Sequence, residues 1–135
     1  MKLHLTNASD KQLITGYSFE DNLEKSSGWI EVNKKRFEHS LIVLPDELVI
    51  CWQVANFKSL TTKNFEEIAH LNQGNFKLEV VLLGTGQTHQ FGHPRLSRCL
   101  TDAGISVEYM ATDAACRTYN FLMAEGRTVA AALIV

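Results

Sequence analysis

The chain has 135 residues, of which 45% are hydrophobic and 21% are charged, and its formal net charge is -2. This is the composition of a globular protein, and it excludes a disordered or fibrous chain. Because no basic cluster is longer than the run Lys34, Lys35 and Arg36, the charge pattern also excludes a typical nucleic-acid-binding surface.

Length and polarity bear on organisation and location as well. A chain of this length fits one domain, residues 1–135, and it shows no linker, repeat or low-complexity segment. No stretch reaches the roughly 20 apolar residues of a membrane helix, and residues 1–10 are too polar for a signal peptide. The three cysteines have no CxxC spacing, which argues against a disulfide framework and a zinc knuckle. We therefore expect a cytoplasmic protein without membrane insertion, metal or cofactor.

The first half of the chain is predicted to form short antiparallel strands. Three turn-punctuated apolar runs cover residues 14–19, 29–32 and 37–44. The run at residues 48–54 is almost continuously apolar, which is typical of a strand that is covered on both faces.

Helices and strands are predicted to alternate from there onward. Thr62 can cap a helix with one apolar face, and Asn72 to Gly74 provide its exit. Residues 78–83 have the pattern of a buried strand. Pro94 suits the first turn of a second helix, because the first helical position needs no amide donor.

The last third continues the alternation. Gly104 closes the second helix, residues 106–110 form a short strand, and Thr112 can cap a helix that runs to about Ala124 before a terminal strand at residues 128–135. This order predicts an α/β fold in three layers, with a central, mixed, mostly parallel sheet flanked by helices. The amino-terminal half is expected to add a further antiparallel β-layer.

The turn Gly84-Thr85-Gly86 at the end of a buried strand is the first candidate site. Gly84 and Gly86 match the first two glycines of a dinucleotide-binding loop, but His89 occupies the third position. The next helix is predicted to begin only at Pro94, which makes the loop too long. No Gly-Lys-Ser/Thr follows, so a Walker loop is excluded. Two interpretations stay open: the glycines only turn the chain, or the turn binds a ligand beside the carboxyl end of the strand.

A polar stripe on the helix after Thr112 is the second candidate site. Asp113, Arg117 and Asn120 are four and three residues apart, so they share one face of a helix. An arginine held by Asp113 can meet an anion, whereas a solvated ion pair of this spacing contributes only about 0.3–0.5 kcal/mol. Both interpretations stay open, and a ligand site would need the Thr85 turn and the Arg117 helix at one rim of the sheet.

Other reactive side chains form weaker patterns. Cys116 lies one turn inside the helix, where the helix dipole and Arg117 can lower its pKa, but a buried cysteine is more often an apolar core residue. His89 and His93 have the four-residue separation of metal ligands on a helix, yet they fall in a predicted loop. Glu108 lies near the spacing of a ribose-binding acid, which is a loose match. Since no catalytic constellation is complete, the sequence favours a protein that is not an enzyme.

Three longer stretches resemble one known family. They are SLIVLPDELVICWQV, VVLLGTGQTHQFGHP and AGISVEYMATDAACRTYNFLMAEGRTVAAAL, and the resemblance to the Mth-type domain family spans residues 13–135. It implies a three-layer fold around a mixed sheet, and, from a mitochondrial relative, an assembly role through protein partners. The motif positions that carry over have no catalytic role assigned: Gly84, Thr85, Gly86, Arg117, Thr118, Tyr119, Asn120, Glu125, Gly126 and Arg127.

Two functional hypotheses follow from the sequence. The first is a non-enzymatic protein-interaction or complex-assembly factor with an unidentified protein partner. The alternative is a domain, or an enzyme, that binds a small anionic ligand. The candidate ligand-binding residues are Gly84, Thr85, Gly86, Asp113, Arg117 and Asn120.

Overall fold

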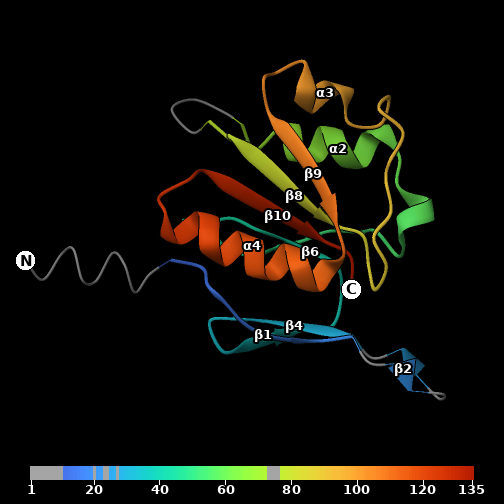
Figure 1. Ribbon diagram of the computed structural model, residues 1–135, viewed down its shortest axis with the longest axis vertical. Coiled ribbons are helices and arrows are strands. Elements are labelled where there is room, and N and C mark those ends of the chain that lie inside the picture. Colours follow the sequence, from blue (N-terminus) through green and yellow to red (C-terminus); the bar gives the residue numbers. More distant parts are fainter. Residues whose placement is uncertain (1–10, 20, 23–24, 27, 73–76) are drawn as a thin grey trace, which may run out of the picture.

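A five-stranded mixed sheet forms the centre of the computed structural model, which describes residues 11–19, 21–22, 25–26, 28–72 and 77–135 (Figure 1). In sheet order the strands are β7 (Ile50–Cys51), β6 (Leu41–Val43), β10 (Val129–Leu133), β8 (Val80–Gly84) and β9 (Ser106–Met110). Strands β10, β8 and β9 pair in parallel, whereas β6 runs antiparallel to both β10 and β7. The predicted mixed central sheet is therefore confirmed.

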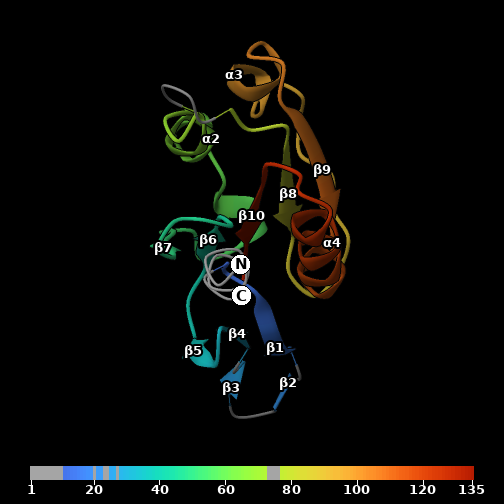
Figure 2. The ribbon, with the colours of Figure 1, turned by 90° about the vertical axis from the view of Figure 1, so that its left-hand side faces the viewer.

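Helices cover both faces of this sheet (Figure 2). On one face lie α2 (Thr62–Ala69), α3 (Arg98–Thr101) and the 3-10 turn η1 (Phe57–Ser59), and on the other face lies α4 (Thr112–Ala124). Every residue of β8 and β10 is buried, because each of these strands has packed side chains above and below it. The three-layer arrangement of the prediction is thus confirmed.

The amino-terminal strands form a second, three-stranded antiparallel sheet on the same side as α4. Its order is β1 (Ile14–Ser18), β4 (Trp29–Val32) and β5 (Lys35–Phe37). A two-stranded piece, β2 (Asp21–Asn22) with β3 (Lys25–Ser26), lies beyond it in Figure 1. Because Ile14, Ile30 and Val32 share one apolar core with β10 and α4, this sheet closes the lower face of the central one. The expected extra antiparallel β-layer is confirmed.

The strand predicted at residues 37–44 is wrong as a single element. Phe37 ends β5 in the small sheet, and Leu41 begins β6 in the central sheet. The chain changes sheets between them, and Ser40 secures this crossing because its hydroxyl donates to the carbonyl of Val54 at 2.7 Å.

The strand predicted at residues 48–54, covered on both faces, is also wrong. Only Ile50 and Cys51 form β7, and this strand pairs with β6 alone, at the edge of the sheet. Cys51 is exposed, and Leu48 is 84% exposed. An apolar run without alternation does not show which of its residues the fold will bury.

Two predicted helix starts are displaced. Thr61, one residue before the predicted cap, occupies the cap position of α2, and its N–H donates to Asn64 Oδ1 at 2.8 Å. The second helix begins at Arg98 instead of Pro94, because the preceding residues form turns in which the Leu96 N–H donates to the carbonyl of His93 at 2.9 Å. Of the predicted exit of α2, residues 73 and 74 lie outside the described residues.

Candidate functional site

The turn after β8 packs against the first residue of α4. The Gly86 N–H donates to Thr112 Oγ1 at 2.8 Å, and the Thr112 N–H donates to the Gly86 carbonyl at 2.8 Å. Gly84 permits this approach, because a β-carbon there would lie 2.8 Å from Thr112 Oγ1. The predicted neighbourhood of the turn and the helix is therefore present in the structure.

Thr112 does not cap α4 as predicted. Ala111 occupies the cap position, and the Thr112 hydroxyl donates instead to the carbonyl of Ile134 at 2.8 Å. Since the same oxygen accepts the Gly86 amide, Thr112 ties the turn after β8 to the end of β10.

Thr85 is used to shape the loop that follows β8. Its side chain is buried, with 3% of the residue exposed. Its hydroxyl donates to the Thr88 carbonyl at 2.6 Å and accepts the Gln90 N–H at 3.2 Å. A ligand could reach this hydroxyl only by replacing these internal bonds.

Asn120 joins α4 to the edge of β1. Its Oδ1 accepts the Ile14 N–H at 2.9 Å, and its Nδ2 donates to the Ile14 carbonyl at 2.7 Å. The side-chain amide thus supplies the donor and the acceptor that a neighbouring strand would supply. This role explains why an amide stands where an exposed helix face would carry Lys or Glu.

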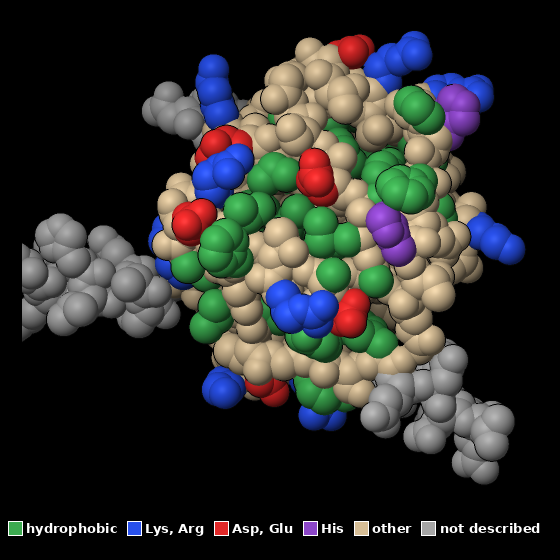
Figure 3. Space-filling model, viewed as in Figure 1, with side chains coloured by type: hydrophobic (Ala, Val, Ile, Leu, Met, Phe, Trp, Pro, Cys, Tyr) green, Lys and Arg blue, Asp and Glu red, His purple; other side chains and the backbone are tan. Residues whose placement is uncertain are grey.

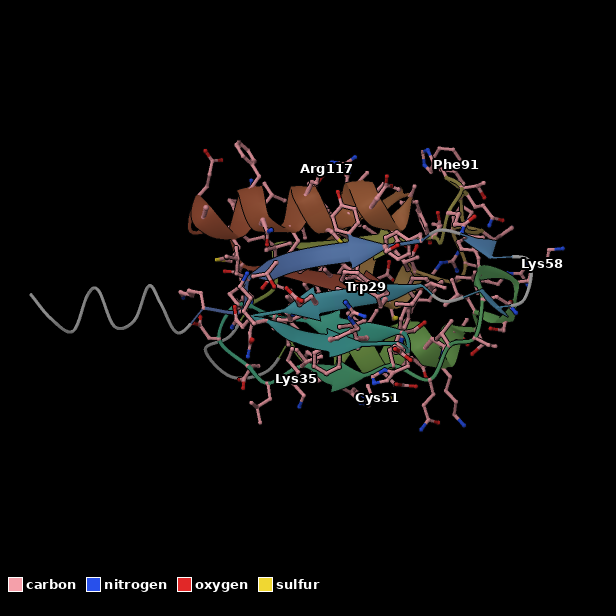
Figure 4. The ribbon with its side chains drawn as sticks, turned by 90° about the horizontal axis from the view of Figure 1, so that it is seen from below. Trp29, Lys35, Cys51, Lys58, Phe91 and Arg117 are labelled. Carbon is pink, nitrogen blue, oxygen red and sulfur yellow. The ribbon has the colours of Figure 1, made fainter. Side chains whose placement is uncertain are left out.

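Arg117 also turns toward β1, on the outer side of α4 (Figure 4). Its Nη1 donates to the Tyr17 hydroxyl at 2.7 Å and lies 3.7 Å from Asp113 Oδ2. The side chains of Arg117 and Asp113 are 60% and 47% exposed. The ion pair predicted from their spacing is present, and water screens it.

Two further residues of α4 belong to the core. Tyr119 is fully buried, its hydroxyl donates to the Gln12 carbonyl at 2.7 Å, and burial raises its pKa. Burial, with a smaller contribution from Asp113, raises the pKa of Cys116 to about 12. Cys116 is 1% exposed within the apolar core, and a buried thiol with a raised pKa stays protonated near neutral pH, which favours the core interpretation over a reactive thiolate.

The structure brings the six predicted ligand residues together only in part. Gly84, Thr85 and Gly86 meet the start of α4, whereas Arg117 and Asn120 direct their hydrogen bonds at β1. The turn and the arginine therefore satisfy different internal partners. Ligand binding by this set stays a prediction.

The loop that contains both histidines carries an exposed aromatic side chain. Phe91 is 76% exposed, and its ring centroid lies 4.4 Å from that of His89. His93 Nδ1 accepts the N–H of Arg95 at 3.1 Å. Within the described ranges, no three His, Cys, Asp or Glu side chains gather as metal ligands would.

The end of the family motif fixes the start of β10. Gly126 ends α4 with a φ of +82°, a conformation that favours glycine. Glu79 accepts the Thr128 N–H at 2.9 Å and the Arg127 Nε at 3.1 Å. The bond from Thr128 and the neighbouring Arg127 lower the pKa of Glu79.

A groove that the sequence prediction missed lies on the opposite flank of α4, toward β9. Its volume is about 240 Å³, and it appears in Figure 3 as an apolar area between charged side chains. It is lined by Val80, Leu82, Ser106, Glu108, Met110, Thr118, Leu122 and Arg127. The sequence does show that Ser106, Glu108 and Met110 alternate along one strand and so share one face of it. It does not show where α4 lies over the sheet, and the groove depends on that position.

None of the helices in the described part of the chain combines the length and the hydropathy that a membrane span requires.

The model of a family described as "Protein of unknown function (DUF498/DUF598)" matches residues 24–134. A Bos taurus relative named "NADH dehydrogenase (ubiquinone) 1 alpha subcomplex assembly factor 3" is 35% identical over 109 residues, which are 81% of this chain and 57% of the relative. The chain thus spans little more than half the length of that relative.

Solved structures with the same fold come from two Bordetella species. A crystal structure from Bordetella parapertussis has a TM-score of 0.79 at 37% identity and covers 92% of this chain and 95% of its own. A solution structure from Bordetella pertussis, described as a Mth938-like domain, has a TM-score of 0.73 at 32% identity, with coverages of 91% and 85%.

Proposed function

Because the chain belongs to the family described as protein of unknown function (DUF498/DUF598), we propose that it is a non-enzymatic protein-interaction factor that assists the assembly of a multisubunit complex. The name of the bovine relative supports an assembly role and suggests an NADH dehydrogenase as the complex. That the chain contacts a protein partner in such a complex is likewise proposed.

One observation carries this proposal: the polar residues of the family motif are engaged in holding the fold together. Arg117, Tyr119 and Asn120 bond to the segment at residues 12–17, and the Gly86 amide bonds to Thr112. Catalysis needs polar groups that are aimed at a substrate. Motif residues that bond to other parts of the same chain favour a scaffold that presents surfaces to a partner.

Deletion of the gene in its host tests the proposal. We expect the full-size NADH dehydrogenase to decrease and its subcomplexes to accumulate, as measured by native gel electrophoresis with in-gel activity staining. Re-expression of the wild-type chain should restore the full-size complex. Normal amounts of the complex in the deletion strain would contradict the proposal. Fractionation of the same cells tests the proposed cytoplasmic location.

A second candidate function is binding of a small anionic ligand by the predicted residue set. One observation favours it: the turn after β8 lies against the start of α4, and the Arg117 side chain on that helix is 60% exposed. A thermal-shift screen with nucleotides, inorganic phosphate and carboxylates tests it, because a ligand at 100 times its Kd adds about 2.7 kcal/mol. Arg117→Ala should remove the shift and leave the free chain nearly as stable. A screen without any shift would count against this function.

A further inference from the structure

The edge of the central sheet at β9 is open. Among the described strands β9 pairs only with β8, and in Figure 2 no strand lies beyond it. Ser106 and Glu108 of this strand are exposed. An edge strand offers a row of backbone donors and acceptors, and extended segments of partner proteins bind such rows.

Val107 and Tyr109 carry the backbone groups of this free edge. The Ser106 N–H donates to the Glu79 carbonyl at 3.1 Å, and the Met110 carbonyl accepts the Thr85 N–H at 2.8 Å. The backbone N–H and C=O groups of Ser106 and Met110 therefore face β8. Residues of a strand alternate between its two edges, so Val107 and Tyr109 turn their N–H and C=O groups outward. No residue of the described ranges donates to or accepts from these four groups.

The side-chain groove lies directly beside this free edge. Leu82 forms part of its floor, and Met110 and Leu122 contribute apolar walls from β9 and α4. Glu108 is the acid in this lining, and it forms no ion pair with any described residue. Arg127, which also lines the groove, is already 3.1 Å from Glu79. The groove therefore offers apolar contacts around one carboxylate that lacks a cation.

We propose that β9 accepts an extended segment of a partner protein as a sixth strand of the central sheet. This segment carries Lys or Arg opposite Glu108 and apolar side chains two positions before and after it, which enter the groove. The proposal rests on the protein-interaction function proposed above and specifies the surface and the type of segment that it binds.

A second copy of the chain fits this edge less well. An antiparallel two-fold pair centred on β9 places Glu108, the middle residue of the strand, opposite Glu108 of the other copy. Like charges directly opposite each other on neighbouring strands are destabilising. A segment with a basic residue gains attraction at the same position, which favours it over a second copy in this register.

A display library of short random linear peptides tests the side-chain rule. It is selected on the wild-type chain, on Glu108→Lys and on the matched control Glu67→Lys, which reverses the same charge on an exposed position of α2. We expect the wild-type and control chains to enrich peptides with a basic residue between apolar residues at alternate positions. Glu108→Lys should enrich an acidic residue instead and should bind the wild-type peptides about tenfold more weakly, the equivalent of roughly 1.4 kcal/mol.

N-methylated versions of the best peptide test backbone pairing. Methylation of the amides that face β9 should abolish binding, whereas methylation of the alternate amides should leave it nearly unchanged, because the two sets point to opposite edges of the added strand. A peptide that docks only by its side chains would lose affinity similarly in both forms, and that result would overturn the strand addition.

Other outcomes decide against the proposed occupant or the proposed site. Sedimentation that shows a dimer of the wild-type chain, which the selected peptides dissociate, would assign the edge to a second copy. Equal peptide binding by wild-type and Glu108→Lys chains of equal Tm would overturn the site, and Glu108→Gln repeats the comparison without charge reversal. A Glu108→Lys chain that no longer binds the peptides but restores complex assembly in the deletion strain would contradict this binding site and leave the proposed function intact. Normal assembly in the deletion strain itself would contradict the proposed function.

Discussion

The two flanks of α4 have opposite chemistry. Toward β1, Arg117, Tyr119 and Asn120 each bond to the amino-terminal strand region, which closes that flank. Toward β9, Thr118 and Leu122 line a groove beside an acid without an ion pair. Arg117, Tyr119 and Asn120 of the family motif therefore stabilise the fold, whereas Thr118 of the same motif lies on the flank with the accessible groove.

Asn120→Ala should show the largest effect on the closed flank. It removes two hydrogen bonds and leaves the N–H and C=O of the buried Ile14 without their partner. We expect the free energy of unfolding to fall by about 2–3 kcal/mol, measured by urea denaturation. Thr118→Ala, on the groove flank of the same helix, should change it by less than about 0.5 kcal/mol. Equal losses in the two variants would contradict the distinction between the flanks.

Thr112→Val should have the next largest effect. The isosteric change removes the hydroxyl that accepts the Gly86 amide and donates to the Ile134 carbonyl, both at 2.8 Å. A loss of about 1–2 kcal/mol is expected in the same assay, because both backbone groups lose a partner. A stability equal to that of the wild type would show that this link between the turn and β10 is dispensable.

Tyr119→Phe should have a smaller effect than either. The ring stays in the core, and only the hydrogen bond from its hydroxyl to the Gln12 carbonyl disappears. We expect a loss of about 1 kcal/mol. A much larger loss would indicate that the hydroxyl supports more of the closed flank than this one bond.

The pH dependence of Glu79 provides the mildest test, at the far end of the sheet. The Thr128 N–H, followed by Arg127, lowers the pKa of Glu79 from its ordinary value of 4.5. The folded pKa is below the unfolded pKa, so the stabilisation is complete above the unfolded value and is lost as the pH falls through the folded value. Glu79→Gln should therefore flatten the acid limb of the Tm profile, whereas Glu67→Gln on α2 serves as the matched control. If the Tm of Glu79→Gln fell with decreasing pH as steeply as that of the wild type, the contacts of Glu79 with Thr128 and Arg127 would not contribute to the pH dependence of stability.

Local patterns were sufficient to predict much of the fold. The strand Ser106–Met110 has the predicted bounds and the helix Thr112–Ala124 has the predicted end, because alternating polarity and a helical apolar face are local properties. The strand predicted at residues 37–44 failed because the chain changes sheets at Ser40, and this change depends on contacts with Val54 that no local pattern contains.

The candidate site was predictable only in its location. Adjacency of the Thr85 turn and α4 followed from the predicted order of strands and helices. The partners of Arg117 and Asn120, which are Tyr17 and Ile14, lie about a hundred residues away in the sequence and belong to a separate sheet. A single sequence gives no register between that sheet and α4, so it could not show that the motif is used internally.

Backbone amide exchange, measured by NMR on the free chain and with the best library peptide, reports directly whether β9 is a free edge that accepts a strand. We expect the amides of Val107 and Tyr109 to exchange rapidly in the free chain and to slow by at least about tenfold in the complex, while the Ile14 amide, bonded to Asn120, is protected in both. Val107 and Tyr109 amides that are already protected in the free chain, or that the peptide leaves unchanged, would contradict the proposed strand addition.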